Sequence, residues 1–249
     1  MAKQLEGRVA LVTGASSGIG AATATALVDG GARVAVAARR AGRLAELVER
    51  IRHAGGEAIA VDADVADRAA AERMVAATVE RFGRLDILVN NAGLMKLAPF
   101  AAGSPDDWRA MIDVNLLGVL YCTHAALPHL KRAGGGHVVN ISSVAGREPF
   151  PTGAVYCATK YGVIGFSETL RREHLADKLR VTVIEPGAVA TELVDQVTDE
   201  KAKQQIQAWQ AAMRQLQPAD IAAAIVYAVT QPDRVAVNEL LVRPTDQAL

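Results

Sequence analysis

Cysteine is scarce in this chain: Cys122 and Cys157 are the only two among 249 residues. Two isolated thiols exclude a scaffold held by several disulfides, and their positions do not match the spacing of a zinc site. The five histidines also form no H-E-x-x-H or similar pattern, so the sequence predicts no catalytic metal. We expect both thiols to be reduced side chains of the core.

An excess of charge of either sign is also lacking. The chain has 27 basic and 27 acidic residues with no block of like charge, which argues against a nucleic-acid surface or a polybasic membrane patch. The opening residues, MAKQLEGRVALVTG, contain no apolar stretch of the signal-peptide type, and no uninterrupted apolar run of about 18 residues occurs. We therefore expect a soluble cytoplasmic protein.

Short apolar runs alternate with helical patterns along the whole chain. Several runs are apolar at nearly every position, which is typical of strands buried on both faces of a parallel sheet. The predicted strands are 8–13, 33–38, 57–63, 86–91, 137–142, 180–186 and 238–242, and the predicted helices are 18–29, 40–53, 67–82, 105–132, 153–176 and 218–230. This alternation predicts a single α/β domain over residues 1–249, with a doubly wound sheet of seven mostly parallel strands and helices on both faces.

Residues 189–216 interrupt the alternation with a polar helical insertion before the helix at 218. An insertion at the carboxyl end of a parallel sheet is well placed to cover a substrate. We expect a substrate lid; an ordinary solvated helix is an alternative that the pattern supports about equally.

The first predicted strand ends in TGASSGIG, where Gly14, Gly18 and Gly20 lead into a helix. Glycines allow a tight turn and let the backbone approach a ligand, while the start of the helix offers free N–H groups to a pyrophosphate. This loop predicts nucleotide binding.

TGASSGIG resembles the opening of the nicotinamide-nucleotide site in the short-chain dehydrogenase/reductase family. Further motifs of that family follow in order at the expected strand ends, which makes the resemblance very specific. They are Asp64-Val65, NNAG at 90–93, Asn115, Ser143, Tyr156, Lys160 and PGAVAT at 186–191. The resemblance implies a Rossmann-type fold and an oxidoreductase that transfers a hydride between a nicotinamide cofactor and a carbonyl or alcohol substrate.

The end of the second predicted strand indicates which cofactor is used. An acidic residue there holds the ribose 2′-hydroxyl of NAD, whereas an arginine accepts the 2′-phosphate of NADP. Ala38 stands where NAD-dependent relatives typically have Asp, and Arg39 and Arg40 follow it. We expect NADP(H) to be preferred over NAD(H), with Arg39 as the main phosphate ligand; two solvated arginines at a helix start are the alternative. Ser17 stands where some NADP-dependent relatives have a basic residue, so we expect the preference for NADP(H) either to be weaker or to rest on Arg39 alone.

The resemblance also implies the remaining cofactor contacts. Asp64 and Val65 would contact the adenine, and Asn90, Ala92 and Gly93 would border the adenosine ribose, although Asn90 has a strong alternative role in tying adjacent strands together. The predicted cofactor site comprises Gly14, Ser16, Ser17, Gly18, Ile19, Gly20, Arg39, Arg40, Asp64, Val65, Asn91, Ala92, Gly93, Tyr156, Lys160, Pro186, Gly187, Val189 and Thr191.

Tyr156 and Lys160 are four positions apart, so a helix places them on one face, one turn apart. A phenol, whose pKa is ordinarily about 10, becomes an effective acid–base group near neutral pH if a nearby cation lowers that pKa. We predict Tyr156 as the acid–base group and Lys160 as that cation. The family implies that Ser143 hydrogen-bonds the substrate oxygen. It also implies that Asn115 holds a relay water by its main-chain carbonyl, with a structural residue in a helix kink as the alternative.

The substrate pocket is expected to include Leu94–Lys96, Val144–Thr152 and the loop after Pro186-Gly187. The lid would add Trp209 and Met213, for which a place on the packing face of the lid is an equally supported alternative. Lys96 and Arg147 are candidates to bind a carboxylate, although salt bridges at the rim are the commoner fate of such side chains. The inferred lining is mixed and favours a polar, medium-sized carbonyl compound. AARR and ELLVRPTDQ look most like NADP-dependent members of the clavulanic-acid-aldehyde-reductase and hydroxy-acid-dehydrogenase type.

The predicted helices 105–132 and 153–176 are apolar around much of their circumference, as expected of helices buried on two sides. Relatives assemble through these two helices, so we expect a homotetramer, with a dimer as the next choice. Three other functions remain as alternatives: a free-standing polyketide-type ketoreductase, a sugar epimerase and a non-catalytic NADP-sensing regulatory protein. Epimerases are usually longer, and sensors typically lose the tyrosine or the lysine that this chain keeps.

Overall fold

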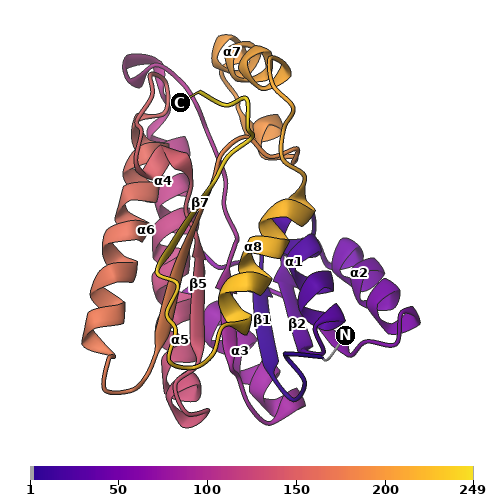
Figure 1. The fold of residues 1–249 in the computed structure, drawn as a ribbon. Helices are drawn as coiled ribbons and strands as arrows, with labels where there is room; N and C mark the ends of the chain where they lie inside the picture. The colour runs from indigo at the N-terminus through magenta and orange to yellow at the C-terminus, as the bar shows by residue number, and fades with distance from the viewer. Residues whose placement is uncertain (1–2, 249) are drawn as a thin grey trace.

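Seven strands form one central sheet in the structure, a computed structural model that describes residues 3–248 (Figure 1). The strand order is β3-β2-β1-β4-β5-β6-β7, and every neighbouring pair runs parallel. The strands are β1 (Val9–Thr13), β2 (Arg33–Ala38), β3 (Ala58–Asp62), β4 (Ile87–Asn90), β5 (His137–Ile141), β6 (Arg180–Pro186) and β7 (Glu239–Val242). The predicted doubly wound sheet is confirmed, and its order reverses between β1 and β4, where such sheets bind ligands.

The helices cover both faces of this sheet (Figure 1). One layer consists of α1 (Gly18–Asp29), α2 (Ala41–His53) and α8 (Pro218–Thr230), and the other of α3 (Arg68–Phe82), α5 (Gly118–Arg132) and α6 (Ala154–Glu173). In β1, Ala10 and Val12 pack against the first layer, while Val9 and Leu11 pack against the second. Because successive strand side chains point to opposite faces, a strand between two helix layers is apolar at every position.

The predicted helix over 105–132 is interrupted in the structure. α4 (Pro105–Ile112) passes into a π-helical turn, η2 (Asp113–Leu117), before α5 begins. A π-helical turn adds backbone to a helix and is frequent at functional sites. Within this turn, Oδ1 of Asn115 accepts a hydrogen bond from the N–H of Leu94, in the loop that follows β4. The interruption of the helix therefore coincides with a contact to a segment 21 residues earlier in the chain.

By length and composition alone, the stretch Pro105–Arg132 is the one helix among residues 3–248 that is long and apolar enough to cross a membrane. A core helix passes the same test. Here Cys122, Ala126 and Leu130 of α5 are buried in the core between the sheet and its second helix layer.

The insertion at 189–216 lies above the carboxyl ends of the strands, at the top of Figure 1. It contains a 3-10 turn, η4 (Val194–Gln196), and a helix, α7 (Glu200–Ala211). Val194 and Ala202 pack with Tyr156 in a third apolar cluster, apart from the two that flank the sheet. Two further 3-10 turns, η1 (Phe100–Ala102) and η3 (Val144–Gly146), follow β4 and β5. The insertion therefore covers the end of the sheet that carries the sequence motifs.

Candidate active site

One large cavity, of about 1410 Å³, opens at the carboxyl ends of the strands. The residues after β2 line one part of it, and Ser143, Tyr156 and Lys160 line another. Because β1 and β4 separate β2 from β5, these two parts lie at opposite ends of the cavity. Of the predicted catalytic and cofactor-binding residues, all but Gly20 and Asn115 line this cavity.

The glycine loop packs too closely for side chains. Gly14 and Gly18 have φ angles of +65° and +55°, in the region that favours glycine. A Cβ atom at Gly14 would lie 2.7 Å from Cα of Ala92, and one at Gly20 would lie 2.4 Å from Nδ2 of Asn91. Gly20 therefore lets α1 pack against the loop after β4, although it does not line the cavity itself.

The N-terminus of α1 is open to an anion. Ser17, its N-cap residue, makes no side-chain capping hydrogen bond, and the first turn has no acidic residue. Since Ser17, Gly18 and Ile19 line the cavity, the free N–H groups and the positive end of the helix dipole lie at its wall. The loop and the helix start therefore fit a pyrophosphate.

The two predicted arginine ligands, Arg39 and Arg40, make different contacts after β2. Arg40 donates from Nε to Oγ of Ser16 at 3.0 Å and from Nη2 to Oγ of Ser17 at 2.7 Å, which ties it to the glycine loop. Arg39 is more exposed, and its Nη1 lies 3.7 Å from Oδ2 of Asp64. Both arginines line the cavity, so both are placed to meet a phosphate there.

Arg43 also lines this end of the cavity, although sequence analysis did not identify it. Its Nη1 donates to the Glu192 carboxylate at 2.6 and 2.9 Å, and Nη1 of Arg40 donates to the same carboxylate at 2.8 Å. These two arginines, Arg40 foremost, lower the pKa of Glu192 to about 2. Arg43 could have been identified from the sequence because residues three positions apart on a helix lie on one face, which places Arg43 beside Arg40. No pattern in the sequence relates Glu192 to these arginines.

The two asparagines after β4 differ in role. Nδ2 of Asn90 donates to Oδ1 of Asn140 at 2.8 Å and to Oγ1 of Thr123 at 3.0 Å, and Asn90 does not line the cavity. Its alternative role as a tie between strands is therefore confirmed. Asn91 lines the cavity while its Nδ2 donates to the carbonyl of Thr13 at 2.9 Å, which anchors the loop to the end of β1.

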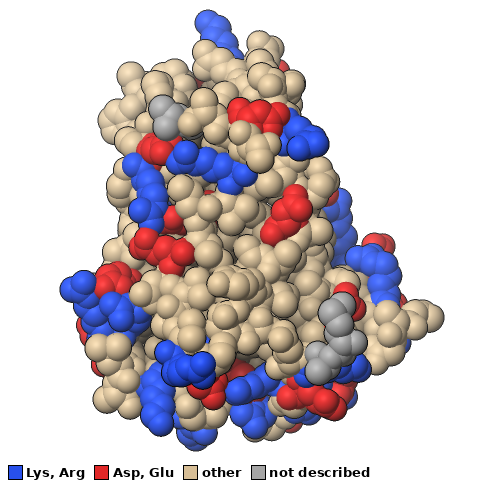
Figure 2. Space-filling model, viewed as in Figure 1, with Lys and Arg blue, Asp and Glu red and all other residues tan. Residues whose placement is uncertain are grey.

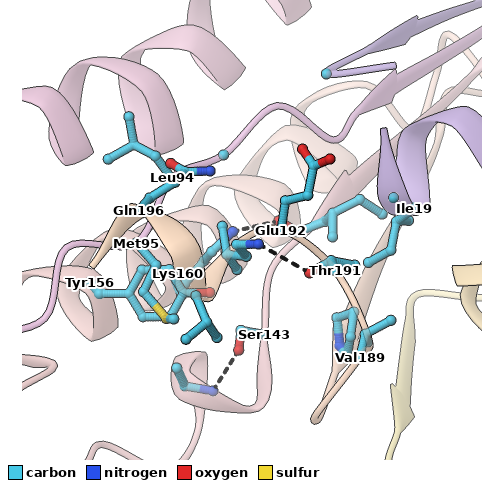
Figure 3. A pocket seen from close by; sticks show the side chains of 18 of the residues that line it. Ile19, Leu94, Met95, Ser143, Tyr156, Lys160, Val189, Thr191, Glu192 and Gln196 are labelled. Carbon is cyan, nitrogen blue, oxygen red and sulfur yellow. Dashed lines mark hydrogen bonds between the residues drawn. The ribbon is translucent and has the colours of Figure 1, made fainter. Parts of the chain in front are cut away.

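Ser143, Tyr156 and Lys160 lie close together on one side of the pocket, across from Ile19 and Thr191 (Figure 3). Ser143 follows β5, and its Oγ accepts a hydrogen bond from the N–H of Ala145 at 3.1 Å. Tyr156 stands in the first turn of α6 and is only 5% exposed. Burial raises the pKa of Tyr156 to about 12, and the Ser143 side chain partly offsets that rise.

Lys160 is placed one turn after Tyr156 on α6, as the spacing predicts. Its Nζ donates to the carbonyl of Ile141 at 3.0 Å and lies 5.6 Å from the centre of the Tyr156 ring. Burial lowers the pKa of Lys160 to about 8. The structure thus differs from the predicted lowering of the phenol pKa, because loss of hydration on burial is the largest influence on that pKa.

The Asn115 side chain is fully engaged in holding the backbone. Its Oδ1 accepts from the N–H of Leu94 at 2.8 Å, and its Nδ2 donates to the Leu94 carbonyl at 2.9 Å and to Oγ1 of Thr159 at 3.3 Å. This side chain therefore positions the loop after β4, and its residue does not line the cavity. The relay role concerns the main-chain carbonyl and stays a prediction.

Three residues of the predicted substrate pocket, Gly146 among them, do not line the cavity. Neither Arg147 nor Met213 lines it, whereas Trp209 does. Arg147 is turned toward the buried Glu185, with Nε donating to Oε2 at 2.6 Å, and it also pairs with Glu239. The predicted pocket role of Arg147 is wrong because those two carboxylates hold its guanidinium outside the cavity.

Lys96 lines the cavity, and its Nζ lies 4.0 Å from a carboxylate oxygen of Asp107. Arg147 is therefore held in salt bridges, the alternative given for it, whereas the carboxylate-binding role of Lys96 stays a prediction. Several polar residues complete the lining without having been predicted from sequence: Gln196, Gln205, Gln210 and Gln247. Oε1 of Gln247 accepts from the N–H of Ala188 at 2.9 Å, so the C-terminal segment reaches the loop after β6.

Both cysteines are free and buried, as expected. Burial raises the pKa of Cys122 to about 12 and also raises that of Cys157, so neither thiol is activated as a nucleophile. Within residues 3–248, no group of three or more His, Cys, Asp or Glu side chains is arranged to hold a metal ion. The sequence-based expectation of metal-free catalysis stays a prediction.

Comparison with known proteins gives one consistent result. The family model described as short chain dehydrogenase matches residues 8–202. An uncharacterised oxidoreductase of Staphylococcus saprophyticus is 40% identical over 244 residues, which cover 97% of this chain and 98% of the relative. The glycine betaine reductase of Emericella nidulans is 43% identical over 245 residues, but these cover only 19% of that longer protein and 98% of this chain.

Solved structures agree with these sequence relatives. An alcohol dehydrogenase from the archaeon Thermococcus sibiricus, complexed with 5-hydroxy-NADP, superposes with a TM-score of 0.86 at 32% identity, covering 97% of this chain and 98% of the other. A metagenomic short-chain oxidoreductase in complex with NADP gives a TM-score of 0.83 at 35% identity, covering 98% and 100%.

Proposed function

The chain belongs to the short-chain dehydrogenase/reductase family of NAD(P)-dependent oxidoreductases, and on that premise we propose that it is an NADP(H)-dependent enzyme that interconverts a carbonyl compound and its alcohol. One observation carries the proposal. Ser143, Tyr156 and Lys160 line the same cavity as the glycine loop and the arginines after β2. A cavity that joins a phosphate-binding end to an acid–base end is what hydride transfer with proton transfer requires.

The bound nicotinamide would supply the hydride to the carbonyl carbon, or accept it from the alcohol. Residues of the chain would handle the substrate oxygen. The Ser143 hydroxyl donates a hydrogen bond to that oxygen and holds it near the phenol. Oη of Tyr156 then gives the oxygen its proton, since a pKa of about 12 keeps the phenol protonated at neutral pH.

Lys160 would restore the proton. With a pKa of about 8, its ammonium group is largely charged at pH 7 yet releases a proton more readily than an exposed lysine. The positive charge stabilises the phenolate that forms when Tyr156 donates. In the oxidative direction the same charge favours removal of the phenol proton. The main-chain carbonyl of Asn115, in the π-helical turn, is proposed to hold a water on the path from Lys160 to solvent.

The preference for NADP(H) rests on the side chains after β2. Ala38 offers no carboxylate to a ribose hydroxyl, and Arg39 and Arg40 line the cavity beside it. The ligands bound to the two similar solved structures, 5-hydroxy-NADP and NADP, support the same assignment. The remaining cofactor contacts are proposed at the predicted residues of the loops after β1, β3, β4 and β6.

The substrate proposed is a polar, medium-sized carbonyl compound, because the far end of the cavity mixes apolar and amide side chains. Met95 and Phe150 provide apolar surface, while Gln196 and Gln210 provide hydrogen-bonding groups. Residues 189–216 would act as the lid of a single domain, since Val194 and Ala202 already pack beside Tyr156.

A homotetramer is proposed because large apolar side chains are exposed on two separate faces. Tyr161 on α6 and Ile112 at the end of α4 are 44% and 38% exposed, on the side of the two helices identified from sequence. On the other side, Tyr227 of α8 and Leu241 of β7 are 55% and 45% exposed. Figure 2 shows that the surface over α8 and β7 carries few charges near its centre.

The test measures consumption of NADPH and of NADH, in parallel, against a panel of aldehydes, ketones and 3-oxo acids. We expect turnover with NADPH that disappears in Tyr156→Phe. Tight NADPH binding without turnover on any member of the panel would instead favour the NADP-sensing alternative. A best substrate among thioester-linked 3-oxo acids would favour the ketoreductase alternative.

A further inference from the structure

The Glu192 carboxylate bridges Arg40 and Arg43 at the end of the cavity that the residues after β2 line. Oε2 of Glu192 accepts from Nη1 of Arg40 at 2.8 Å, and Oε1 accepts from Nη1 of Arg43 at 2.6 Å. Glu192 itself lines the cavity, directly after Thr191 in the segment that leads from β6 to α7 (Figure 3). The first turn of α2 and the start of the insertion are thereby joined across the opening of the cavity.

This carboxylate presents to the arginines the same chemistry as a phosphate. It carries a negative charge at neutral pH, and its oxygens accept hydrogen bonds from guanidinium groups, as phosphate oxygens do. A phosphate monoester carries about 1.5 to 2 negative charges near pH 7. Two such anions held by the same pair of guanidinium groups would repel one another.

The ion pairs of Glu192 with Arg40 and Arg43 are weak enough for another anion to replace the carboxylate. Glu192, Arg40 and Arg43 are each nearly half exposed, with side-chain exposures of 47%, 45% and 47%. Ion pairs at such positions contribute little to folding stability, because water screens them. Arg40 also keeps its hydrogen bonds to Ser16 and Ser17, which do not depend on Glu192. The arginines can therefore exchange the carboxylate for another anion while Arg40 stays anchored to the loop.

We propose that Glu192 is a specificity-determining residue that competes with the cofactor 2′-phosphate for Arg40 and Arg43. This inference rests on the proposed function and adds two residues that the family motifs do not identify. The carboxylate occupies the guanidinium groups when no phosphate is present and is displaced when the phosphate binds. Glu192 thus weakens NADP(H) binding and leaves NAD(H) binding unchanged, which narrows the preference between the two cofactors.

The experiment compares dissociation constants for NADPH and NADH, and for 2′,5′-ADP and 5′-AMP, in the wild type and in Glu192→Gln. Calorimetry or quenching of protein fluorescence reports binding without turnover. We expect the variant to bind NADPH and 2′,5′-ADP about threefold to tenfold more tightly, the range expected from two exposed ion pairs. NADH and 5′-AMP should bind as before, and the gain should shrink at high salt.

The matched control is Glu57→Gln, because Glu57 is also a half-exposed carboxylate paired with an arginine, Arg81 at 2.7 Å, and it does not line the cavity. This control should bind all four ligands like the wild type. Arg43→Ala should weaken binding of NADPH and 2′,5′-ADP alone. Thermal melting of each variant verifies that the fold is intact.

Three results overturn the inference. Unchanged or weaker NADPH binding in Glu192→Gln would show that the carboxylate does not compete, and an equal gain for NADPH and NADH would show that it does not act on the 2′-phosphate. In both cases the proposed function stands if the wild type binds NADPH. A wild type that binds neither dinucleotide would overturn the proposed function itself, and the inference with it.

Discussion

Nζ of Lys160 lies 5.6 Å from the centre of the Tyr156 ring and donates a hydrogen bond to the carbonyl of Ile141 at the end of β5. The ammonium group is therefore held between the strand and the aromatic ring, within a site where both side chains are buried. Burial acts on the two groups in opposite directions, since it raises the pKa of the phenol and lowers that of the ammonium. The pair thus keeps a proton on the tyrosine and holds the lysine proton less tightly.

Removing the phenol oxygen should reduce turnover far more than it weakens cofactor binding. For Tyr156→Phe we expect kcat to fall by about 10² to 10⁴, the usual contribution of a positioned acid–base group, with a much smaller change in the NADPH dissociation constant. Tyr161→Phe is the matched control, because Tyr161 is on the same helix but half exposed, with its hydroxyl on the carbonyl of Arg147. Comparable activity in the two variants would refute the assignment of Tyr156.

Lys160→Met should be inactive yet more stable near pH 7. The lowering of the Lys160 pKa from 10.5 to about 8 corresponds to a cost of about 3 kcal/mol for folding with the lysine charged. Lys160→Met removes this cost, but it also removes the hydrogen bond to the Ile141 carbonyl, which contributes about 1 kcal/mol to stability. We expect a net gain of about 1–2 kcal/mol in the free energy of unfolding.

The pH dependence of unfolding gives a second test of the Lys160→Met prediction. Below pH 8 Lys160 is charged in the folded wild type, so the full cost of burying that charge lowers its stability. As pH rises from about 8 to 10.5, Lys160 loses its proton in the folded state but keeps it in the unfolded state, so this cost disappears. The stability advantage of Lys160→Met should therefore shrink over that interval in urea unfolding curves. An advantage that stays constant with pH would contradict the burial argument.

His137 should make the fold sensitive to acid. It is fully buried, with Nε2 2.7 Å from Oγ1 of Thr182, and burial lowers its pKa from 6.5 to about 3. As pH falls below 6.5 the unfolded state binds a proton that the folded state does not, so stability is lost; at pH 5 the loss is about 2 kcal/mol. Between pH 7 and pH 5, His137→Gln should lose less stability than the wild type by this amount. The exposed His124→Gln serves as control, and equal acid slopes for all three proteins would refute the prediction.

The arginines after β2 should determine cofactor preference. Loss of a charge-assisted hydrogen bond to a phosphate costs about 1.5–3 kcal/mol, so Arg39→Ala and Arg40→Ala should each raise the NADPH dissociation constant about tenfold or more. The dissociation constant for NADH should change little. Arg50→Ala, a substitution at an exposed position of α2 that does not line the cavity, is the control. Equal losses for both cofactors would contradict the assigned phosphate contacts.

Much of this protein is visible in local sequence patterns. The apolar runs predict all seven strands within one residue at either end. The run of the central strand β1 is unbroken because a strand buried on both faces must be apolar at successive positions. Gly14 and Gly18 mark the phosphate loop because few other residues adopt positive φ angles. The four-residue spacing places Tyr156 and Lys160 on one helix face, since it matches the turn of a helix.

The tertiary structure decides what depends on distant neighbours. The pKa of Tyr156 is raised because the packing of the insertion and α6 removes water from the phenol, which the helical spacing alone does not specify. Arg147 is withdrawn from the pocket by Glu185 and Glu239, which belong to strands that follow much later in the chain. Arg43 meets Glu192 only because the strands all run parallel, which places the start of α2 and the segment after β6 at the same edge of the sheet, and because that segment reaches across to α2. Local periodicity records which residues are buried, whereas charge pairing and hydration depend on which segments the folded chain brings together.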